Sequence, residues 1–219
     1  MAKRDIKEKV LQLRAEGKSY SQIREVITVS KSTLSVWLKN KPLTPSQLEM
    51  LQGKNEKRIE NFRSKMLIKR NEKIKKSLVE ASKDIGIFSQ RDIFVGGIFL
   101  YFGEGSKTTK NTTALTNSNP FILKFFILWL GYLNVKRSRI RAKLYLYKDM
   151  DKEKEIIFWT KSLNITRNQI RGPYVKSSNQ SDITYKNSYG HGTCTVLVED
   201  AVLFRKVSAY LKYTTDHFE

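Results

Sequence analysis

The sequence predicts an α+β protein: an all-α domain at the N-terminus, a basic helical connector and a larger α+β domain. Three observations predict this order. Apolar residues recur at helical spacing through the first forty residues, a stretch rich in lysine and arginine follows, and after Arg91 aromatic and branched residues form both helical and alternating patterns. We place the domains at residues 1–42, 43–89 and 90–219. Hydrophobic residues make up 40% of the 219 residues, which is enough for real cores.

The charge balance is strongly basic, with 41 Lys and Arg against 21 Asp and Glu and a net charge of +20. Such a surplus implies a polyanionic partner, either nucleic acid or an anionic membrane surface. A single cysteine, Cys194, excludes an intramolecular disulfide framework and a Cys-based zinc finger. No signal pattern opens the chain, and the longest apolar run, 121–133, is too short to span a bilayer. We therefore expect a soluble, cytoplasmic protein with no membrane partner.

The first forty residues predict three short helices joined by tight turns. Apolar residues recur at helical spacing over residues 4–16, and a glycine follows. Ser19 or Ser21 can cap a second helix, and Ser30 can cap a third over residues 31–39. The third helix is expected to point Leu34, Trp37 and Leu38 inward. The apolar residues of the first two helices are Ile6, Val10, Leu11, Leu13, Ile23, Val26 and Ile27.

The string GKSYSQIREVITVSKSTLSVWLK, residues 17–39, resembles the helix-turn-helix of resolvases and transposase-type DNA-binding domains. The resemblance covers residues 5–40 and implies that the third helix lies in the major groove. Ser19 and Tyr20 would then contact the DNA backbone. A three-helix module that binds protein, or only folds, is the alternative. Val36 also faces outward on the third helix. The residues of that helix that would reach bases or phosphates are Lys31, Ser32, Thr33, Ser35 and Lys39.

The connector begins after Pro42 and Pro45, where Ser46 can cap a new helix. Residues 54–76 hold ten Lys or Arg against three Glu, and apolar residues are sparse. This composition is typical of a solvated linker helix stabilised by i,i+4 charge pairs, and also of a helix that follows DNA phosphates. Both can hold. Membrane-surface binding is disfavoured because the helix lacks a broad apolar face.

The third segment predicts four helices and an antiparallel sheet. Residues 140–147 alternate between apolar side chains and Arg141, Lys143, Tyr145 and Tyr147, which predicts one apolar face and one basic face. Either Asp149 or Asp151 caps the helix that follows this strand. The expected elements are a helix at 90–104, a hairpin at 107–117, a helix at 120–133, a strand at 139–147, a helix to 163, strands at 169–176 and 193–199, and a helix at 200–212.

The stretch VGGIFLYFGEGSK, residues 95–107, ends an apolar helix with a carboxylate at Glu104. An acid there opposes the helix dipole, so a bound cation would explain it. A core helix whose last polar residue meets water is the alternative. Gly105 is expected to take the left-handed conformation that ends many helices.

A helix that ends in an acid–glycine pair, followed by a hairpin, a helix and further strands, resembles the LAGLIDADG homing-endonuclease family. The resemblance implies helices on one face of a saddle-shaped sheet, whose other face lies in the major groove of DNA. It also implies that Glu104 and Gly105 form the site for Mg²⁺ (or Mn²⁺), and that a chain with one motif acts as a homodimer. The sequence departs from the family's pattern at Gly96 and Gly97, which lie two residues farther from the acid, and at Phe99, where a small residue is usual.

Cleavage of a phosphodiester needs a metal to polarise the phosphoryl oxygen and a cation to stabilise the transition state. Lys107 and Lys143 are the candidate catalytic lysines, and Asp149 is either a second metal ligand or a helix cap. His191, in a turn bracketed by glycines, is either catalytic or structural. Cys194 is expected to be a small buried hydrophobe. The sheet residues that would contact DNA, or else face solvent, are Arg139, Arg141, Lys143, Tyr145 and Tyr147.

The sequence therefore predicts sequence-specific binding of double-stranded DNA with metal-dependent cleavage. The alternative is a non-catalytic, DNA-binding transcriptional regulator built from the same two modules, as in sporulation regulators.

Overall fold

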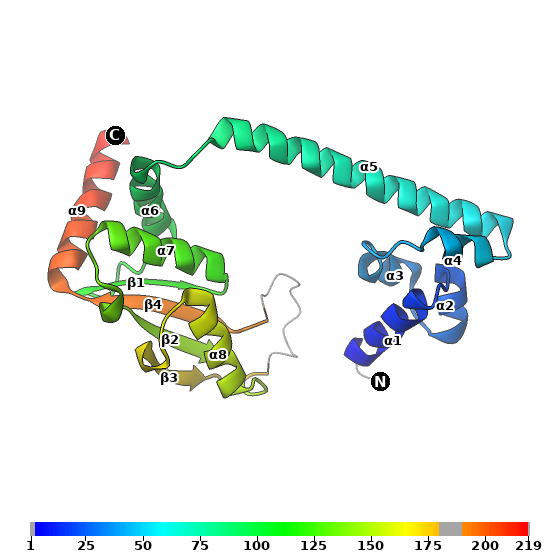
Figure 1. The fold of residues 1–219 in the computed structure, drawn as a ribbon. Coiled ribbons are helices and arrows are strands. Elements are labelled where there is room, and N and C mark those ends of the chain that lie inside the picture. The colour runs from blue at the N-terminus through cyan, green and yellow to red at the C-terminus, as the bar shows by residue number, and fades with distance from the viewer. Residues whose placement is uncertain (1–2, 180–189, 219) are drawn as a thin grey trace. The chain divides into compact units, whose positions relative to one another are not determined.

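The computed structural model describes residues 3–179 and 190–218. The chain divides into two units, Met1–Gly86 (unit 1) and Ile87–Glu219 (unit 2) (Figure 1). Unit 1 is all-α in its described residues, whereas unit 2 contains helices and a four-stranded sheet, so the predicted α+β class is confirmed. The connector, predicted as a segment of its own, lies within unit 1.

Unit 1 begins with three helices, α1 (Lys3–Ala15), α2 (Tyr20–Val26) and α3 (Lys31–Trp37), at the predicted places. Serine side chains cap the second and third helices because their oxygens accept bonds from otherwise unpaired backbone N–H groups. Ser19 accepts from the N–H of Gln22, and Ser30 accepts from that of Thr33. The buried residues of this three-helix core are Val10, Tyr20, Ile23, Leu34 and Leu38.

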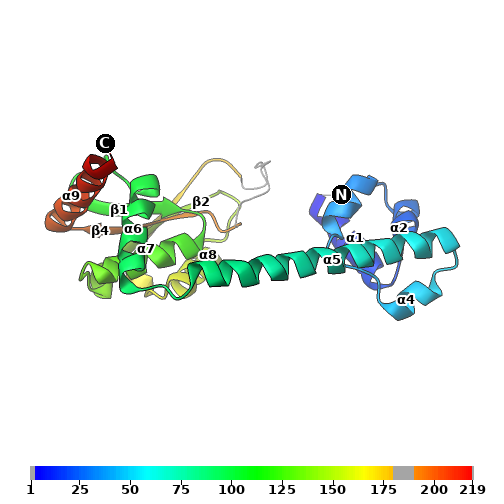
Figure 2. The same ribbon diagram turned by 90° about the horizontal axis from the view of Figure 1, so that it is seen from above.

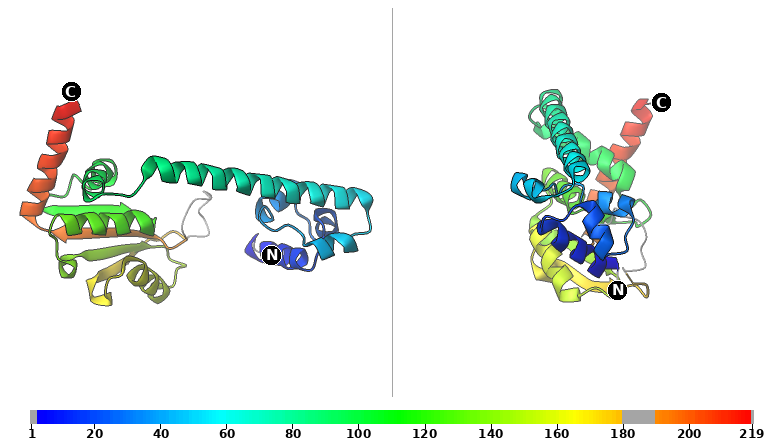
Figure 3. Two further views of the ribbon diagram at one scale, coloured as in Figure 1. Left: turned by 45° about the horizontal axis from the view of Figure 1, so that its top comes forward. Right: turned by 90° about the vertical axis from the view of Figure 1, so that its right-hand side faces the viewer.

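Two further helices complete unit 1, α4 (Pro45–Met50) and α5 (Lys54–Ile85). Thr44, rather than the predicted Ser46, caps α4, because the fixed φ of Pro45 suits the first helical position and places the cap one residue before it. Figure 3 shows α1–α4 gathered against the N-terminal half of α5, which continues beyond them as one helix of 32 residues.

Unit 2 contains the predicted helices, and one of them is longer than expected. The helices are α6 (Gln90–Glu104), α7 (Pro120–Tyr132), α8 (Lys152–Leu163) and α9 (Ala201–Phe218), and the short 3₁₀ turns are Arg137–Arg139 and Arg167–Gln169. The strands are β1 (Thr112–Asn117), β2 (Arg141–Leu146), β3 (Ile170–Val175) and β4 (Thr193–Glu199). Most of the predicted polar loop, 177–188, falls outside the described residues.

The sheet is mixed, so the prediction of an antiparallel sheet is wrong. Its order is β1–β4–β2–β3, with β4 antiparallel to both neighbours and β3 parallel to β2. The reason is that α8 connects β2 to β3, and a helical crossover returns the chain in the same direction.

The predicted hairpin at 107–117 is also wrong. Gly105 forms only an isolated bridge to Leu115, and the N–H of Ser106 donates to the carbonyl of Ala114 at 2.8 Å. The partner of β1 is instead β4, from Thr112 opposite Glu199 to Asn117 opposite Cys194.

The core of unit 2 lies between one face of the sheet and the helices. α7 and α8 lie on the same side of the sheet (Figures 1 and 2), while α6 and α9 pack against each other and against β1. On β2 the predicted alternation is confirmed, because Ala142, Leu144 and Leu146 are fully buried and the residues between them are partly exposed. The largest fully buried side chains in this core are Trp129, Trp159, Tyr101 and Phe126.

Glycines of α6 serve packing rather than a left-handed turn. Gly105 has φ −73°, so the prediction of a left-handed conformation is wrong. A Cβ there would lie 2.4 Å from a ring carbon of Tyr101, and one on Gly97 would lie 1.9 Å from Trp129 of α7. Both positions therefore require glycine because another group occupies the space of a side chain.

Among the described residues, no single helix is both long and apolar enough to cross a membrane. Only α5 and α6 taken together, as a bent pair, reach the length and apolar composition of a membrane span.

Candidate nucleic-acid interface

The outer face of α3 carries most of the predicted DNA-contacting side chains. Lys31, Ser32, Ser35, Val36 and Lys39 are all exposed, while Leu34 and Leu38 on the opposite face are buried. The helix therefore presents small hydroxyl groups with a lysine near each end. Such groups can approach base edges and phosphates closely.

Thr33 differs from the rest of this set because it helps to cap its own helix. Its side chain is half-buried, and its Oγ1 lies 2.8 Å from Ser30 Oγ, which also lies 2.9 Å from Ser32 Oγ. These hydroxyls fix the N-terminus of α3.

Ser19 and Tyr20 do not contact a phosphate backbone as predicted, because both are buried. Ser19 Oγ donates to Glu56 of α5 at 2.8 Å. The Tyr20 ring lies 3.6 Å from the guanidinium of Arg63, and burial raises the pKa of its hydroxyl. These side chains instead attach α2 to α5.

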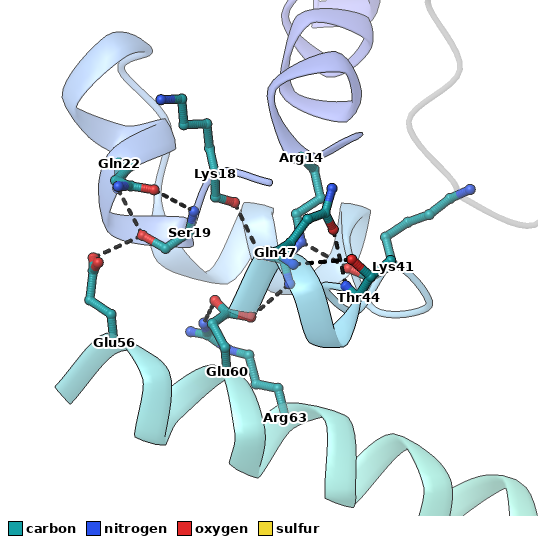
Figure 4. Close-up of polar contacts among 10 residues, drawn as sticks. All are labelled: Arg14, Lys18, Ser19, Gln22, Lys41, Thr44, Gln47, Glu56, Glu60 and Arg63. Atoms are coloured by element: carbon teal, nitrogen blue, oxygen red, sulfur yellow. Dashed lines mark hydrogen bonds and ion pairs between the residues drawn. The ribbon is translucent and has the colours of Figure 1, made fainter. Parts of the chain in front are cut away.

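A buried ion-pair network joins the three-helix core to α5 (Figure 4). Arg14 Nη2 lies 2.7 Å from Glu60 Oε2, and the two side chains are only 4% and 2% exposed. Arg63 pairs with the other oxygen of Glu60. Arg14 also donates to the carbonyls of Lys18 and Lys41, at 3.1 and 2.8 Å, so its charge is well satisfied. The sequence did not predict this network.

A groove of about 790 Å³ runs between α3 and α5 within unit 1. Its walls combine exposed apolar side chains, such as Val36, Phe62 and Met66, with cations. The basic residues that line it are Lys39, Arg63, Lys69, Arg70 and Lys73. Positive charge therefore continues from the outer face of α3 onto α5.

The face of the sheet away from α7 and α8 forms a second polar surface among the described residues of unit 2, although Thr195 on it is buried. One row across the strands contains Thr116, Thr195, Lys143 and Arg171, with the two threonine hydroxyls 2.6 Å apart. The next row places Tyr145 beside Tyr174, with ring centroids 5.9 Å apart. Lys143 also lies 5.4 Å from the ring of Tyr145. Arg171 and Tyr174 were not predicted as site residues, because the pairing of β3 with β2 was not foreseen.

Two of the predicted sheet cations are engaged within the protein. Arg139 lies in a 3₁₀ turn rather than on the strand, and it pairs with Asp200 at 2.8 Å. Arg141 donates to the carbonyls of Ser138 and Ile140, at 2.6 and 2.9 Å. The prediction that Arg139 lies on the strand is wrong, so the basic surface centres on Lys143.

Two acids at the C-terminal end of β4, Glu199 and Asp200, are kept ionised by neighbouring groups. Hydrogen bonds from Arg171 lower the pKa of Glu199. The backbone N–H of Leu203, together with Arg139, lowers the pKa of Asp200. These carboxylates offset part of the positive charge around them.

Glu104 is exposed at the C-terminal end of α6, and Gly105 is the C-cap residue. The Nζ of Lys107 donates to the carbonyl of Gly105 at 3.1 Å, so this lysine lies close to the end of the helix. Lys143 lies on β2, two strands away from β1, which corresponds to about 10 Å at normal strand spacing. The structure therefore places Lys107 at the carbonyl of Gly105, which follows Glu104, and places Lys143 on a strand that is not adjacent to β1.

A metal site at Glu104 would have few protein ligands in the described part of the chain. Those residues include no group of three or more His, Cys, Asp or Glu that could hold a metal ion. Mg²⁺ is often bound by only one or two carboxylates together with water and substrate phosphates, so an exposed carboxylate fits part of such a shell. Of the two candidate caps of α8, Asp151 is the one that caps it, accepting from Glu153 N and Lys154 N.

His191 and Cys194 are both held inside unit 2. His191 Nδ1 lies 2.8 Å from Glu155 Oε2, and its ring stacks on Phe158 at 3.5 Å. The carbonyl of His191 also accepts a bond from Trp159 Nε1. Cys194 is fully buried, as predicted, and burial raises the pKa of its thiol.

The chain matches no protein-family model, no curated protein and no solved structure.

Proposed function

We propose that this chain binds double-stranded DNA in a sequence-specific manner, with α1–α3 acting as a helix-turn-helix and α3 as its recognition helix. The observation that carries the proposal is the two-sided character of α3. Leu34 anchors its inner face, and its C-cap residue Leu38 is also buried. Its outer face exposes Lys31 and Ser35, and Lys39 is exposed just beyond its end. A net charge of +20 supports the same conclusion, because such proteins gain affinity by releasing counterions from DNA.

The buried ion-pair network supports a DNA-binding module in which α5 is held rigidly against the three helices. Arg14, Glu60 and Arg63 fix α5 to the three helices, so lysines and arginines of α5 keep a constant position relative to α3. Cations at fixed positions can contact phosphates on either side of the groove that a recognition helix enters.

The sheet of unit 2 is proposed as a second DNA surface, as in a LAGLIDADG-like domain. The face away from α7 and α8 carries Lys143, two tyrosines and the exposed Thr116, which can donate to phosphates and base edges. The acids Glu199 and Asp200 restrict this surface to the part around Lys143 and Tyr145.

Selection of bound duplexes from a randomised DNA pool by the full chain tests the proposal. We expect one enriched sequence motif, bound with an affinity that falls steeply as salt rises. Binding without enrichment of any motif would contradict sequence-specific recognition, and absence of binding would contradict the proposal as a whole.

Metal-dependent cleavage of DNA is a second candidate function, favoured by the exposed carboxylate of Glu104 beside Lys107. When bound, Mg²⁺ or Mn²⁺ would polarise the phosphoryl oxygen. Glu104 would be its protein ligand, and Lys107 would supply positive charge near the reacting phosphate. Each chain offers one such acid, so cutting both strands would need a homodimer.

A plasmid library that contains the selected motif tests cleavage in Mg²⁺. Glu104→Gln should abolish nicking, whereas Glu80→Gln, an exposed acid on α5, should not change it. Nicking by Glu104→Gln at the rate of the unmodified chain would remove Glu104 from the reaction. Intact DNA binding with no cleavage by either protein would favour the alternative function, a non-catalytic transcriptional regulator.

A further inference from the structure

The C-terminal half of α5 exposes an apolar face that nothing covers in the described residues. From Asn71 to Ile85 every side chain except Ala81 is exposed. Ile74 is 51% exposed, Leu78 65% and Ile85 59%. A helix of this length gains little stability by itself in water, and packing of an apolar face normally holds such a helix together. This face therefore calls for a partner.

The spacing of the face is that of a coiled coil rather than of a core helix. The positions alternate in steps of four and three residues, which is the heptad pattern of a and d sites. Leu67, Ile74 and Ala81 fall at d, while Asn71, Leu78 and Ile85 fall at a. This seam is narrower than the face of a helix that binds a membrane surface. A single polar residue at an a site is a known device for fixing register and the number of strands.

We infer that α5 pairs with α5 of a second copy of this chain, as an antiparallel two-stranded coiled coil. The seam is self-complementary in that direction. With the two-fold axis at residue 76, Ile74 lies opposite Leu78, and Ile85 lies opposite Leu67, which is half-buried and lines the groove beside α3. Asn71 lies opposite the small Ala81, which leaves its amide room. Every a residue then faces a d residue, as antiparallel packing requires.

Charge complementarity selects the antiparallel direction. The g positions of antiparallel helices face each other, which sets Arg70 of each chain opposite Asp84 of the other, twice by symmetry. Within its own chain Arg70 Nη2 donates to Asn40 Oδ1 at 2.6 Å, so the pair with Asp84 would share or replace that bond. The unfavourable contact is Lys75 against its own copy, near the axis. In a parallel pair Arg70 would instead face Lys75 twice, with no compensating acid. The antiparallel pair therefore has two attractive contacts and one repulsive contact, whereas the parallel pair has two repulsive contacts.

The mass of the full chain in solution tests the pairing, by sedimentation or light scattering. We expect about 51 kDa, twice the 25.5 kDa of one chain. Leu78→Glu places a charge in the seam and should return the mass to that of a monomer. Val79→Glu makes the same change at an exposed neighbour (48% exposed) outside the seam and should leave the dimer intact. Circular dichroism checks that both variants keep their helices.

Spin labels test the direction of the pair. Lys69→Cys, Lys76→Cys and Lys83→Cys all lie at the outward f position, and Cys194 is buried and stays unlabelled. An antiparallel pair gives the shortest label-to-label distance at residue 76, with longer and equal distances at 69 and 83, because each of those is offset by about 21 Å along the axis. Three equal distances would show a parallel pair and overturn the assignment of direction.

Each other outcome also bears on the inference. A monomeric chain, or a dimer that Leu78→Glu leaves unchanged, would overturn it. In the second case the Phe99→Glu variant alters an exposed residue of α6. A monomeric mass for this variant would locate the dimer contact in unit 2. DNA binding is not the readout, so failure of the pairing and failure of the proposed function are separate results.

Discussion

Glu60 is the residue that ties the three-helix core to α5. Its carboxylate lies between Arg14 and Arg63, and its side chain is almost entirely buried. A buried ion pair is not strong support for net stability, because desolvation costs about as much as the attraction returns. Removal of one partner is different, since it leaves the other charge buried without compensation.

Glu60→Ala should therefore lower the free energy of unfolding of unit 1 by about 3–5 kcal/mol. Denaturant unfolding of the full chain, followed by circular dichroism, measures it. Glu72→Ala, an exposed acid on the same helix, should change stability by less than about 0.5 kcal/mol. Equal effects of the two substitutions would show that the network does not hold α5 in place.

The contacts of Glu60 also show why the sequence predicts local contacts of single residues but not distant ones. Ser30 was correctly predicted as a cap because its partner lies three residues away, and the requirement is local. Arg14 lies 46 residues from Glu60, so no local pattern joins them. Gly105 was assigned a turn conformation, but its role depends on the position of the Tyr101 ring.

At the scale of elements, α6 and α7 meet at a position where only glycine fits. A Cβ on Gly97 would lie 1.9 Å from Trp129, whose Nε1 donates to the carbonyl of Phe94 at 3.0 Å. Gly103, on the same helix, has no heavy atom within 4 Å of the equivalent point. The two glycines therefore form a matched pair.

Gly97→Ala should destabilise unit 2 by about 1–3 kcal/mol or more, because α6 and Trp129 must move apart. Gly103→Ala should instead stabilise it by up to about 1 kcal/mol, because alanine is the better helix former. Thermal unfolding of the two variants measures the difference. The opposite order of stability would contradict the packing of α6 on α7.

The stability of unit 2 should fall as pH decreases below about 5. Hydrogen bonds from Arg167 lower the pKa of Glu153, and the pKa values of Glu199 and Asp200 are lowered as described. Because the unfolded chain binds protons more readily than the folded one, this stability is present above the ordinary pKa values of 4.5 and 3.8 and is lost as pH falls through the lowered values.

Thermal midpoints measured from pH 6 to pH 3 check this dependence. The Arg171→Gln variant removes the partner of Glu199 and should show a shallower fall. A midpoint that rises on acidification, or the same slope in both proteins, would contradict the role of these ion pairs.

Elements were predicted well where their signals are local and poorly where pairing is distant. The alternation of β2 and the apolar helices α6 and α7 followed from periodicity. β1 was expected to pair within a hairpin, but Thr116 instead faces Thr195, 79 residues away. The parallel pairing of β3 depends on the crossover through α8, which periodicity does not specify.

At the scale of the whole molecule, two candidate DNA surfaces occur in one strongly basic chain. Unit 1 presents α3 and the cations of α5, and unit 2 presents the sheet face around Lys143. A chain with a net charge of +20 would bind DNA to some extent by charge alone. Charge alone does not select a DNA sequence, and we propose that α3 does.

The affinity for the selected duplex, relative to a scrambled duplex of equal composition, tests this claim most directly. The variant Lys31→Ala/Ser35→Ala/Lys39→Ala removes exposed groups from α3, and Lys7→Ala/Lys9→Ala removes the same charge from exposed positions on α1. We predict that the α3 variant reduces the ratio of the two affinities by roughly tenfold or more, since each lost base contact is worth about 1–3 kcal/mol. The α1 variant should keep the ratio. An unchanged ratio in the α3 variant would contradict the assignment of α3 as the recognition helix.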